Sequence, residues 1–367
     1  VVYLSATPFL ESYLDMTRQF KDMTFYELLW PESMMQIPKV EVIKSKKSVF
    51  KLCSELTGKY REGKGNSTVV DGKEFVAKEA VFYINDVSVI KNIIKKNGLK
   101  VDEVNIICSS KSENIKKLNE LSREVGEKFM IGDIPGKGEP HKMFTFCTST
   151  AYAGCDFYST NAATFVISDC NRPNTAVDIA TELVQIAGRQ RLACNPFRQF
   201  LTFVYNVNAE EVEQEAFNEH LCRKVNVTLD EIRDNNNAGE ALRAKRIKDF
   251  RRIPDNVKYQ DSYTMYDEQK GEFVFNRLAY VNEQYCFDVQ KFNYQKGVIV
   301  KKLLQDSSFD VSENQTYAVY QEQLKHLIKK EPFVDRMQAY CEYQARADCQ
   351  SRNVNTGKQI SRIEILL

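Results

Sequence analysis

Short apolar runs alternate with helical patterns along residues 80–206, and this alternation constrains the fold more than any other feature. The run AVFYIND (80–86) precedes the amphipathic stretch VSVIKNIIKKNGL (87–99), which together make one β-α unit. The later apolar runs are VNIICSS (104–110), MFTFCTS (143–149), TFVISD (164–169) and QFLTFVYN (199–206). Helices are predicted after the first of these, to about Gly126, and over about 176–192. Such continuously apolar strands are typical of a parallel sheet with helices on both faces, so we predict an α/β fold.

The segments on either side of this alternation are less regular. In TVV-DG-KEF (68–75), the Asp-Gly pair supplies the positive φ that a type I′ turn needs, which predicts a hairpin. This hairpin is either purely structural or a strand-separating pin. After Asn206 the composition becomes acidic and helical as far as the break NNNAG. We therefore expect a mostly helical or α+β C-terminal domain over 207–367.

Two stretches of that C-terminal domain stand out. ALRAKRIKDFRR (241–252) carries six basic residues and one acidic residue, spread around a predicted helix. It is equally compatible with a phosphate-contacting element and with a solvated helix. FVFNRLAYV (273–281) and YCFDVQKFNY (285–294) are predicted to be strands or a mixed element.

The composition excludes several classes of protein. Lys and Arg number 51 against 50 Asp and Glu, which excludes a strongly basic nucleic-acid-packing protein and leaves room for a local basic groove. No window of about 18 apolar residues exists, so we expect a soluble, cytoplasmic protein, in the host cytoplasm if of phage origin, with no membrane partner. The ten cysteines form no C-x-x-C pair and histidines number three, which argues against zinc sites and a histidine triad. No metal ligands are predicted in this chain.

Three short strings carry the candidate chemistry, in a fixed order. Ser5 and Thr7 belong to LSATP, which ends an apolar run. TSTAYAGCD (148–156) follows a predicted strand, and QIAGRQR (185–191) lies in a later predicted helix. Hydroxyls and free N–H groups at a strand's carboxyl end, such as those of residues 148–150, are well placed to hold phosphate oxygens without reading bases.

Gly154 and Asp156 favour a nucleotide in the same segment. Gly154 allows close approach of the backbone to a ligand, and the Asp156 carboxylate can accept hydrogen bonds from ribose hydroxyls. An ordinary strand-to-helix turn is the alternative interpretation.

Taken together, and with the predicted strand AVFYIND (80–86) between them, these strings resemble motifs III, IV, V and VI of superfamily 2 helicases, over roughly residues 1–206. Thr148, Ala151, Gly154 and Asp156 match T-x-x-A-x-x-G-x-D, and Gln185, Gly188 and Arg189 match the start of Q-x-x-G-R-x-x-R. The resemblance implies two RecA-like lobes that sandwich ATP, in a P-loop NTPase fold. It further implies that 1–40 ends the first lobe and its linker, that 41–206 is the second lobe, and that 207–367 is an accessory domain.

The resemblance also implies roles for individual residues, which we write as expectations. Thr148, Ser149 and Thr150 would bind the nucleic-acid backbone, with Ser109 and Ser110 after the preceding strand also in position to touch it. Gly154, Asp156 and Gly188 would bind nucleotide, and Gln185, Arg189 and Arg191 would be catalytic. Ser5 and Thr7 would couple the two lobes.

The end of motif VI departs from the family pattern. Position 192 is Leu, and the nearest second arginine, Arg191, comes one residue early, which on a helix is a rotation of about 100°. Either the helix starts or ends differently here, or Arg189 acts as the arginine finger and Arg191 is secondary. Two surface arginines are the alternative interpretation.

We therefore predict an ATP-dependent helicase or translocase acting in DNA replication or repair, with ATP and Mg²⁺ held mainly by an upstream lobe. This chain alone is expected to be inactive, because GDIPGKGEP (132–140) has Gly138 where a Walker A loop needs Ser or Thr. Single- or double-stranded nucleic acid, DNA rather than RNA, is the expected partner, with replication partners bound through 207–367. The alternatives are a non-catalytic nucleic-acid- or partner-binding module with a degenerate lobe and, less favoured, a nucleotide-independent α/β enzyme.

Overall fold

The computed structural model describes residue 26 and residues 38–45, 48–172, 174–208, 213–253 and 262–311. The chain divides into two compact units, Val1–Val311 and Ser312–Leu367, and all described residues belong to the first. Ser5 and Thr7 lie outside the described residues, so the predicted coupling of lobes through them stays a prediction.

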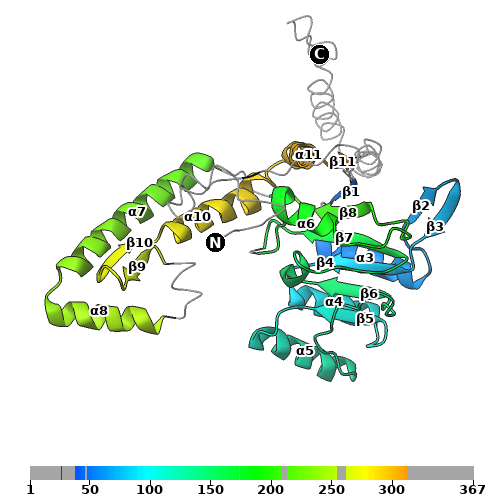
Figure 1. The fold of residues 1–367 in the computed structure, drawn as a ribbon, viewed down its shortest axis with the longest axis horizontal. Helices are drawn as coiled ribbons and strands as arrows, with labels where there is room; N and C mark the ends of the chain where they lie inside the picture. Colours follow the sequence, from blue (N-terminus) through cyan, green and yellow to red (C-terminus); the bar gives the residue numbers. More distant parts are fainter. Residues whose placement is uncertain are drawn as a thin grey trace, which may run out of the picture. The chain divides into compact units, whose positions relative to one another are not determined.

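The largest sheet among the described residues is seven-stranded and all-parallel (Figure 1). Its strand order is β11-β1-β8-β7-β4-β6-β5. The strands are β1 (Lys39–Lys44), β4 (Glu79–Tyr83), β5 (Val104–Ile107), β6 (Phe144–Cys147), β7 (Ala162–Ser168), β8 (Phe200–Tyr205) and β11 (Asp310–Val311). The five strands predicted from the apolar runs are all present, and the α/β fold class is confirmed. The sequence patterns missed the two strands at one edge, β1 and β11.

Helices cover both faces of the sheet, because successive strand side chains point to opposite sides. In β4, Phe82 packs into one hydrophobic cluster while Val81 and Tyr83 pack into the other. The first cluster is covered by α3 (Val49–Arg61), α4 (Val87–Asn97) and α5 (Ser112–Val125). The second is covered by η2 (Ser149–Ala151), the π-helix η3 (Ile179–Leu183), α6 (Val184–Ala187) and α11 (Gly297–Asp306).

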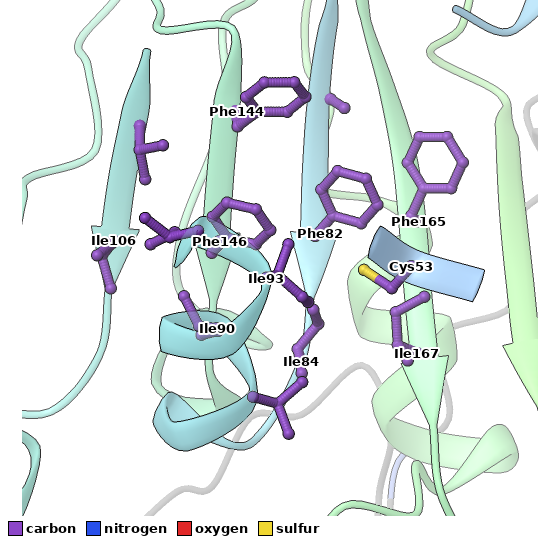
Figure 2. Close-up of a cluster of buried hydrophobic side chains, with 14 of the residues drawn as sticks. Cys53, Phe82, Ile84, Ile90, Ile93, Ile106, Phe144, Phe146, Phe165 and Ile167 are labelled. Atoms are coloured by element: carbon purple, nitrogen blue, oxygen red, sulfur yellow. The ribbon is translucent and has the colours of Figure 1, made fainter. Parts of the chain in front are cut away.

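Three phenylalanines form a ladder across the centre of the first face (Figure 2). Phe82 of β4 lies in register with Phe146 of β6 on one side and Phe165 of β7 on the other. The ring centroids are 5.3 Å and 4.7 Å apart, and the ring planes are within 18° and 17° of parallel. All three rings are fully buried. Offset or parallel pairs of this kind stabilise a core beyond their area of burial.

Local signals set the boundaries of several elements. Asp86 caps α4 by accepting a hydrogen bond from the Ser88 N–H at 2.7 Å, and Gly98 ends the same helix in the left-handed region. The predicted hairpin is confirmed as β2 (Ser67–Val70) and β3 (Lys73–Val76). At its turn, Asp71 has φ 51° and Gly72 has φ 74°, as a type I′ turn requires.

The chain after β8 consists of helices and one further hairpin. These elements are α7 (Gln214–Asn237), α8 (Glu240–Arg252), β9 (Thr264–Asp267), β10 (Glu272–Phe275), α10 (Arg277–Phe287) and the π-helix η4 (Asp288–Phe292). The mixed element predicted over 273–281 is confirmed as a strand followed by a helix. Strand structure over 285–294 is wrong, because this stretch continues the helical backbone of α10 into η4.

Residues 297–311 return to the sheet after this helical segment. Val300 and Leu304 of α11 are fully buried in the second cluster, and β11 adds to the sheet beside β1. The boundary predicted near residue 207 stays a prediction. Within the described ranges, no helix is both long and apolar enough to cross a membrane.

Candidate functional site

The carboxyl ends of the central strands gather the predicted nucleic-acid residues at one edge of the sheet. After β4 and β5 the chain crosses through α4 and α5 on one face, whereas after β6 and β7 it crosses on the other face. The crossovers therefore reverse direction beside β4. In open α/β sheets this reversal leaves a crevice outside the carboxyl ends of the strands, where ligands bind.

The predicted hydroxyl residues lie on two neighbouring strand ends of this edge. Strands β5 and β6 are adjacent, with Ile107 opposite Cys147, so residues 109–110 and 148–150 leave the sheet side by side. Ser110, Ser149 and Thr150 are exposed. Thr148 is buried, with its N–H donating to the Ile107 carbonyl at 2.9 Å. Thr148 thus anchors the loop, while Ser149 and Thr150 are open to a ligand.

Ser109 has a more local role than Ser110. Its carbonyl and its hydroxyl both accept hydrogen bonds from the Asn114 side-chain amide, at 3.1 Å and 3.0 Å. These bonds hold the start of α5 to the end of β5. The exposed Ser110 hydroxyl is the better placed of the two for an external phosphate.

Sequence reasoning missed Asn85, which ties three strand ends together. Its Oδ1 accepts the Ser149 N–H at 3.0 Å, and its Nδ2 donates to the Asn174 carbonyl at 2.6 Å. Asn85 lies two residues after the end of β4, Ser149 follows β6 and Asn174 follows β7. An amide with both a donor and an acceptor is suited to bridge two backbones in this way. The available signal was an Asn at the end of an apolar run in a predicted parallel sheet.

Arg172 makes a second link along the same edge. It lies 3.3 Å from Asp86 and 3.7 Å from Asp169, the first after β4 and the second after β7. Its guanidinium also lies over the Phe50 ring, 4.7 Å from the centroid. Because two carboxylates offset its charge, Arg172 holds the edge together rather than offering a free cation.

The helix predicted over 176–192 is wrong in its extent. Asp178 caps η3, α6 ends at Ala187, and Gly188 follows the helix. The next residues pair with the loop after β6: the Phe157 N–H donates to the Arg189 carbonyl and the Arg191 N–H to the Phe157 carbonyl, both at 2.9 Å. Arg189 and Arg191 are therefore held in a short extended segment. The helical rotation expected between positions 191 and 192 does not apply, which agrees with the interpretation that the helix ends differently.

Both arginines reach the same carboxylate. The Arg191 Nε lies 2.7 Å from Asp156 Oδ1, and the Arg189 Nη1 lies 3.9 Å from the same oxygen. Residues that are 35 and 33 positions apart in sequence thus meet, because strand-like pairing joins their two segments. The structure brings the predicted catalytic arginines and the predicted nucleotide-binding Asp156 together.

The two arginines differ in how many of their guanidinium nitrogens make hydrogen bonds within the protein. Arg189 donates from Nε and Nη2 to the Gln185 carbonyl and side chain, both at 2.7 Å, and from Nη1 to the Cys155 carbonyl at 3.3 Å. Its side chain is 11% exposed, against 48% for Arg191. Arg189 therefore joins α6 to the loop 154–156, whereas Arg191 presents its terminal nitrogens outward.

A cavity of about 410 Å³ lies beside Arg191. Gly188, Gln190, Arg191, Arg198, Gln199 and Ser307 are among its polar lining, and Val184, Ala187, Pro38 and Phe309 are among its apolar lining. Arg191 and Arg198 are the two charged residues in this lining. Nearby, Gly154 has φ 75°, and a Cβ at this position would meet no atom within 4 Å, so its backbone is open to approach.

Glu182 gives the helix that carries Gln185 a pH-sensitive stability. Burial raises the pKa of its carboxyl from 4.5 to about 7, helped by the nearby Asp178 carboxylate and opposed by the Asp178 N–H, which donates to it at 2.9 Å. The folded protein thus binds this proton more tightly than the unfolded chain. The contribution of Glu182 to stability is therefore greatest below about pH 4.5, falls as pH rises to about 7, and is level above that.

We expect Glu182→Gln to remove this pH dependence and to leave the variant more stable than the wild type at pH 8, by up to about 3 kcal/mol. Gln keeps an oxygen that can accept the Asp178 N–H. Urea unfolding at pH 5, 6, 7 and 8 measures the effect, with Glu55→Gln on the exposed face of α3 as the matched control. An unchanged slope of stability against pH in Glu182→Gln would contradict the assignment.

The fold is that of a parallel α/β sheet domain of Rossmann or RecA-like kind. No protein-family model matches the chain, and no curated protein matches it in sequence.

Proposed function

We propose that this chain carries the second motor lobe of an ATP-dependent nucleic-acid helicase or translocase, acting on DNA in replication or repair. One observation carries the proposal. A single loop, 148–157, holds the exposed Ser149 and Thr150 at the strand edge and also Asp156, which pairs with Arg189 and Arg191. The candidate nucleic-acid contact and the candidate nucleotide contact are thus a few residues apart on one segment.

The nucleotide side of the proposal rests on charge and space. Asp156 is the candidate acceptor for ribose hydroxyls, and Arg191, in the lining of the cavity, is the candidate phosphate ligand. ATP with Mg²⁺ supplies the phosphoryl group that is transferred to water. An upstream lobe with a Walker A loop is required by the proposal, because the group of residues around Asp156 contains no magnesium ligand set.

The proposed roles of the two arginines are the reverse of those favoured by the sequence, in which Arg189 was the arginine finger and Arg191 was secondary. Arg189 is a positioning residue, since its three nitrogens hold Gln185 and Cys155 in place. Arg191 is the arginine finger, since Nη1 and Nη2 have no hydrogen-bond partner among the described residues and its side chain is half-exposed. When nucleotide approaches, the Asp156–Arg191 pair opens, so that the carboxylate and the guanidinium each take a part of the ligand.

The nucleic-acid side rests on the edge formed by Ser110, Ser149 and Thr150. These hydroxyls make contacts to phosphate that carry no sequence information, as a translocating motor requires. Asn85 positions the Ser149 N–H. Cys155 Sγ lies 3.9 Å from the Thr150 carbonyl. Through this contact, a movement of residues 155–156 would also move Thr150.

A non-catalytic nucleic-acid-binding module is the second candidate, and the near-complete internal bonding of Arg189 favours it. An assay of ATP hydrolysis by the protein with both lobes, with and without single-stranded DNA, separates the two. Hydrolysis that DNA stimulates at least tenfold supports the motor. DNA binding without any hydrolysis supports the module, and loss of both activities contradicts both proposals.

A further inference from the structure

Helix α8 carries more positive charge than any other described helix, and tertiary packing divides that charge between two faces. Over Glu240–Arg252 it has six basic and two acidic residues. Arg243 donates from Nη2 to the Gly271 carbonyl in the β9–β10 turn. Arg251 makes two hydrogen bonds to the Glu268 carboxylate, at 2.9 Å and 2.7 Å. These two arginines are used to pack α8 on the hairpin.

Of the other four cations, Arg246 is half-buried, and the remaining three form a stripe on the outer face. Lys245, Lys248 and Arg252 are all exposed, and their spacing of three and four residues places them on one side of an α-helix. Within the described ranges, neither lysine has a hydrogen bond or ion pair. Arg252 has one weak partner, Asp249, at 3.8 Å. The stripe therefore keeps a net charge of about +2 even after this pair is counted.

The charge of the stripe favours a polyanionic partner. The three cations are about 4.5 Å and 6 Å apart along the helix axis, which gathers their charge on one face. Lysines on flexible stems act as mobile point charges, which suits contacts to a backbone rather than to base edges. A protein surface would instead favour an apolar centre with few lysines.

We infer that the outer face of α8 is a contact to the phosphate backbone of nucleic acid. The inference rests on the proposed function and deepens it. Lys245, Lys248 and Arg252 add affinity that is independent of base sequence and depends strongly on salt, because each contact releases condensed counterions.

The test compares two triple variants of the full chain. The first is Lys245→Gln, Lys248→Gln, Arg252→Gln, in which Gln preserves helix propensity and removes charge. The control is Lys59→Gln, Lys96→Gln, Lys100→Gln, which removes three exposed cations near the C-terminal ends of α3 and α4. Circular dichroism and thermal unfolding check that both are folded.

Fluorescence anisotropy with labelled single-stranded and duplex DNA, from 50 to 300 mM KCl, gives the slope of log affinity against log salt. The slope is negative. We expect the α8 variant to reduce its magnitude by about 2.7 on duplex DNA or about 2.1 on single-stranded DNA, and the control variant to leave it unchanged.

The possible outcomes bear separately on the α8 inference and on the proposed function. A wild-type slope in the α8 variant, with DNA binding intact, overturns the inference and leaves the proposed function standing. Equal loss in both triple variants also overturns it, because the effect then reflects overall charge. Absence of DNA binding by the wild type overturns the nucleic-acid part of the proposed function and this inference with it.

Discussion

Arg191→Ala is expected to lower DNA-stimulated ATP hydrolysis by about 10³-fold or more in the protein with both lobes, with little change in folding stability. A guanidinium that neutralises charge on the transferring phosphoryl group is worth about 10³–10⁵ in rate. Arg191 is half-exposed, lines the cavity and uses only Nε in its pair with Asp156. The loss should appear in kcat, because the interaction is strongest in the transition state.

Arg189→Ala is the matched comparison. It removes hydrogen bonds to Gln185 and Cys155, so we expect a lower melting temperature together with reduced turnover. Steady-state kinetics and thermal unfolding of the two variants separate the roles. Full turnover in Arg191→Ala removes this residue from the site. If Arg189→Ala loses turnover while its folding stability is unchanged, Arg189 is the arginine finger instead.

Phe82→Ala is expected to destabilise the fold by about 3–5 kcal/mol. Phe82 is the middle ring of the ladder on the first face of the sheet (Figure 2), with Phe146 and Phe165 on either side, and its removal leaves a cavity that the rigid strands cannot close. Urea unfolding measures the change at constant pH.

Two control variants test whether the loss of stability in Phe82→Ala comes from the buried ring. Phe292→Ala removes a ring that is 41% exposed and should cost less than about 1 kcal/mol. Phe82→Leu keeps much of the volume and should cost less than Phe82→Ala. A change below about 1 kcal/mol in Phe82→Ala would show that the ladder is not the centre of the core.

The apolar runs of residues 80–206 were enough to predict the five central strands and the α/β class. Each such strand is buried on both faces, so its sequence is apolar without interruption, as in AATFVIS of β7. Strand β1, KVEVIK, escaped prediction because it lies near the sheet edge and alternates charged with apolar residues. The two-residue β11 is too short to carry any pattern.

In the candidate site too, some residues could be predicted from the local sequence and others could not. Glycine and hydroxyl residues after apolar runs predicted where Thr148, Ser149 and Gly154 lie. Asn85 carried no local signal strong enough to single it out, since its partners Ser149 and Asn174 are 64 and 89 positions away. The end of α6 was mistaken because pairing of Arg189 and Arg191 with Phe157, not local helix propensity, ends the helix there.

The five central strands and the turn at Asp71-Gly72 could be predicted from the sequence. Both depend on each residue's own conformational preferences and its near neighbours. The contact of Arg191 with Asp156, the pairing of β11 with β1 and the exposed face of α8 formed by Lys245, Lys248 and Arg252 could be seen only in the folded structure. The physical reason is that these contacts join distant segments, and burial of one face of each element selects which side chains remain free.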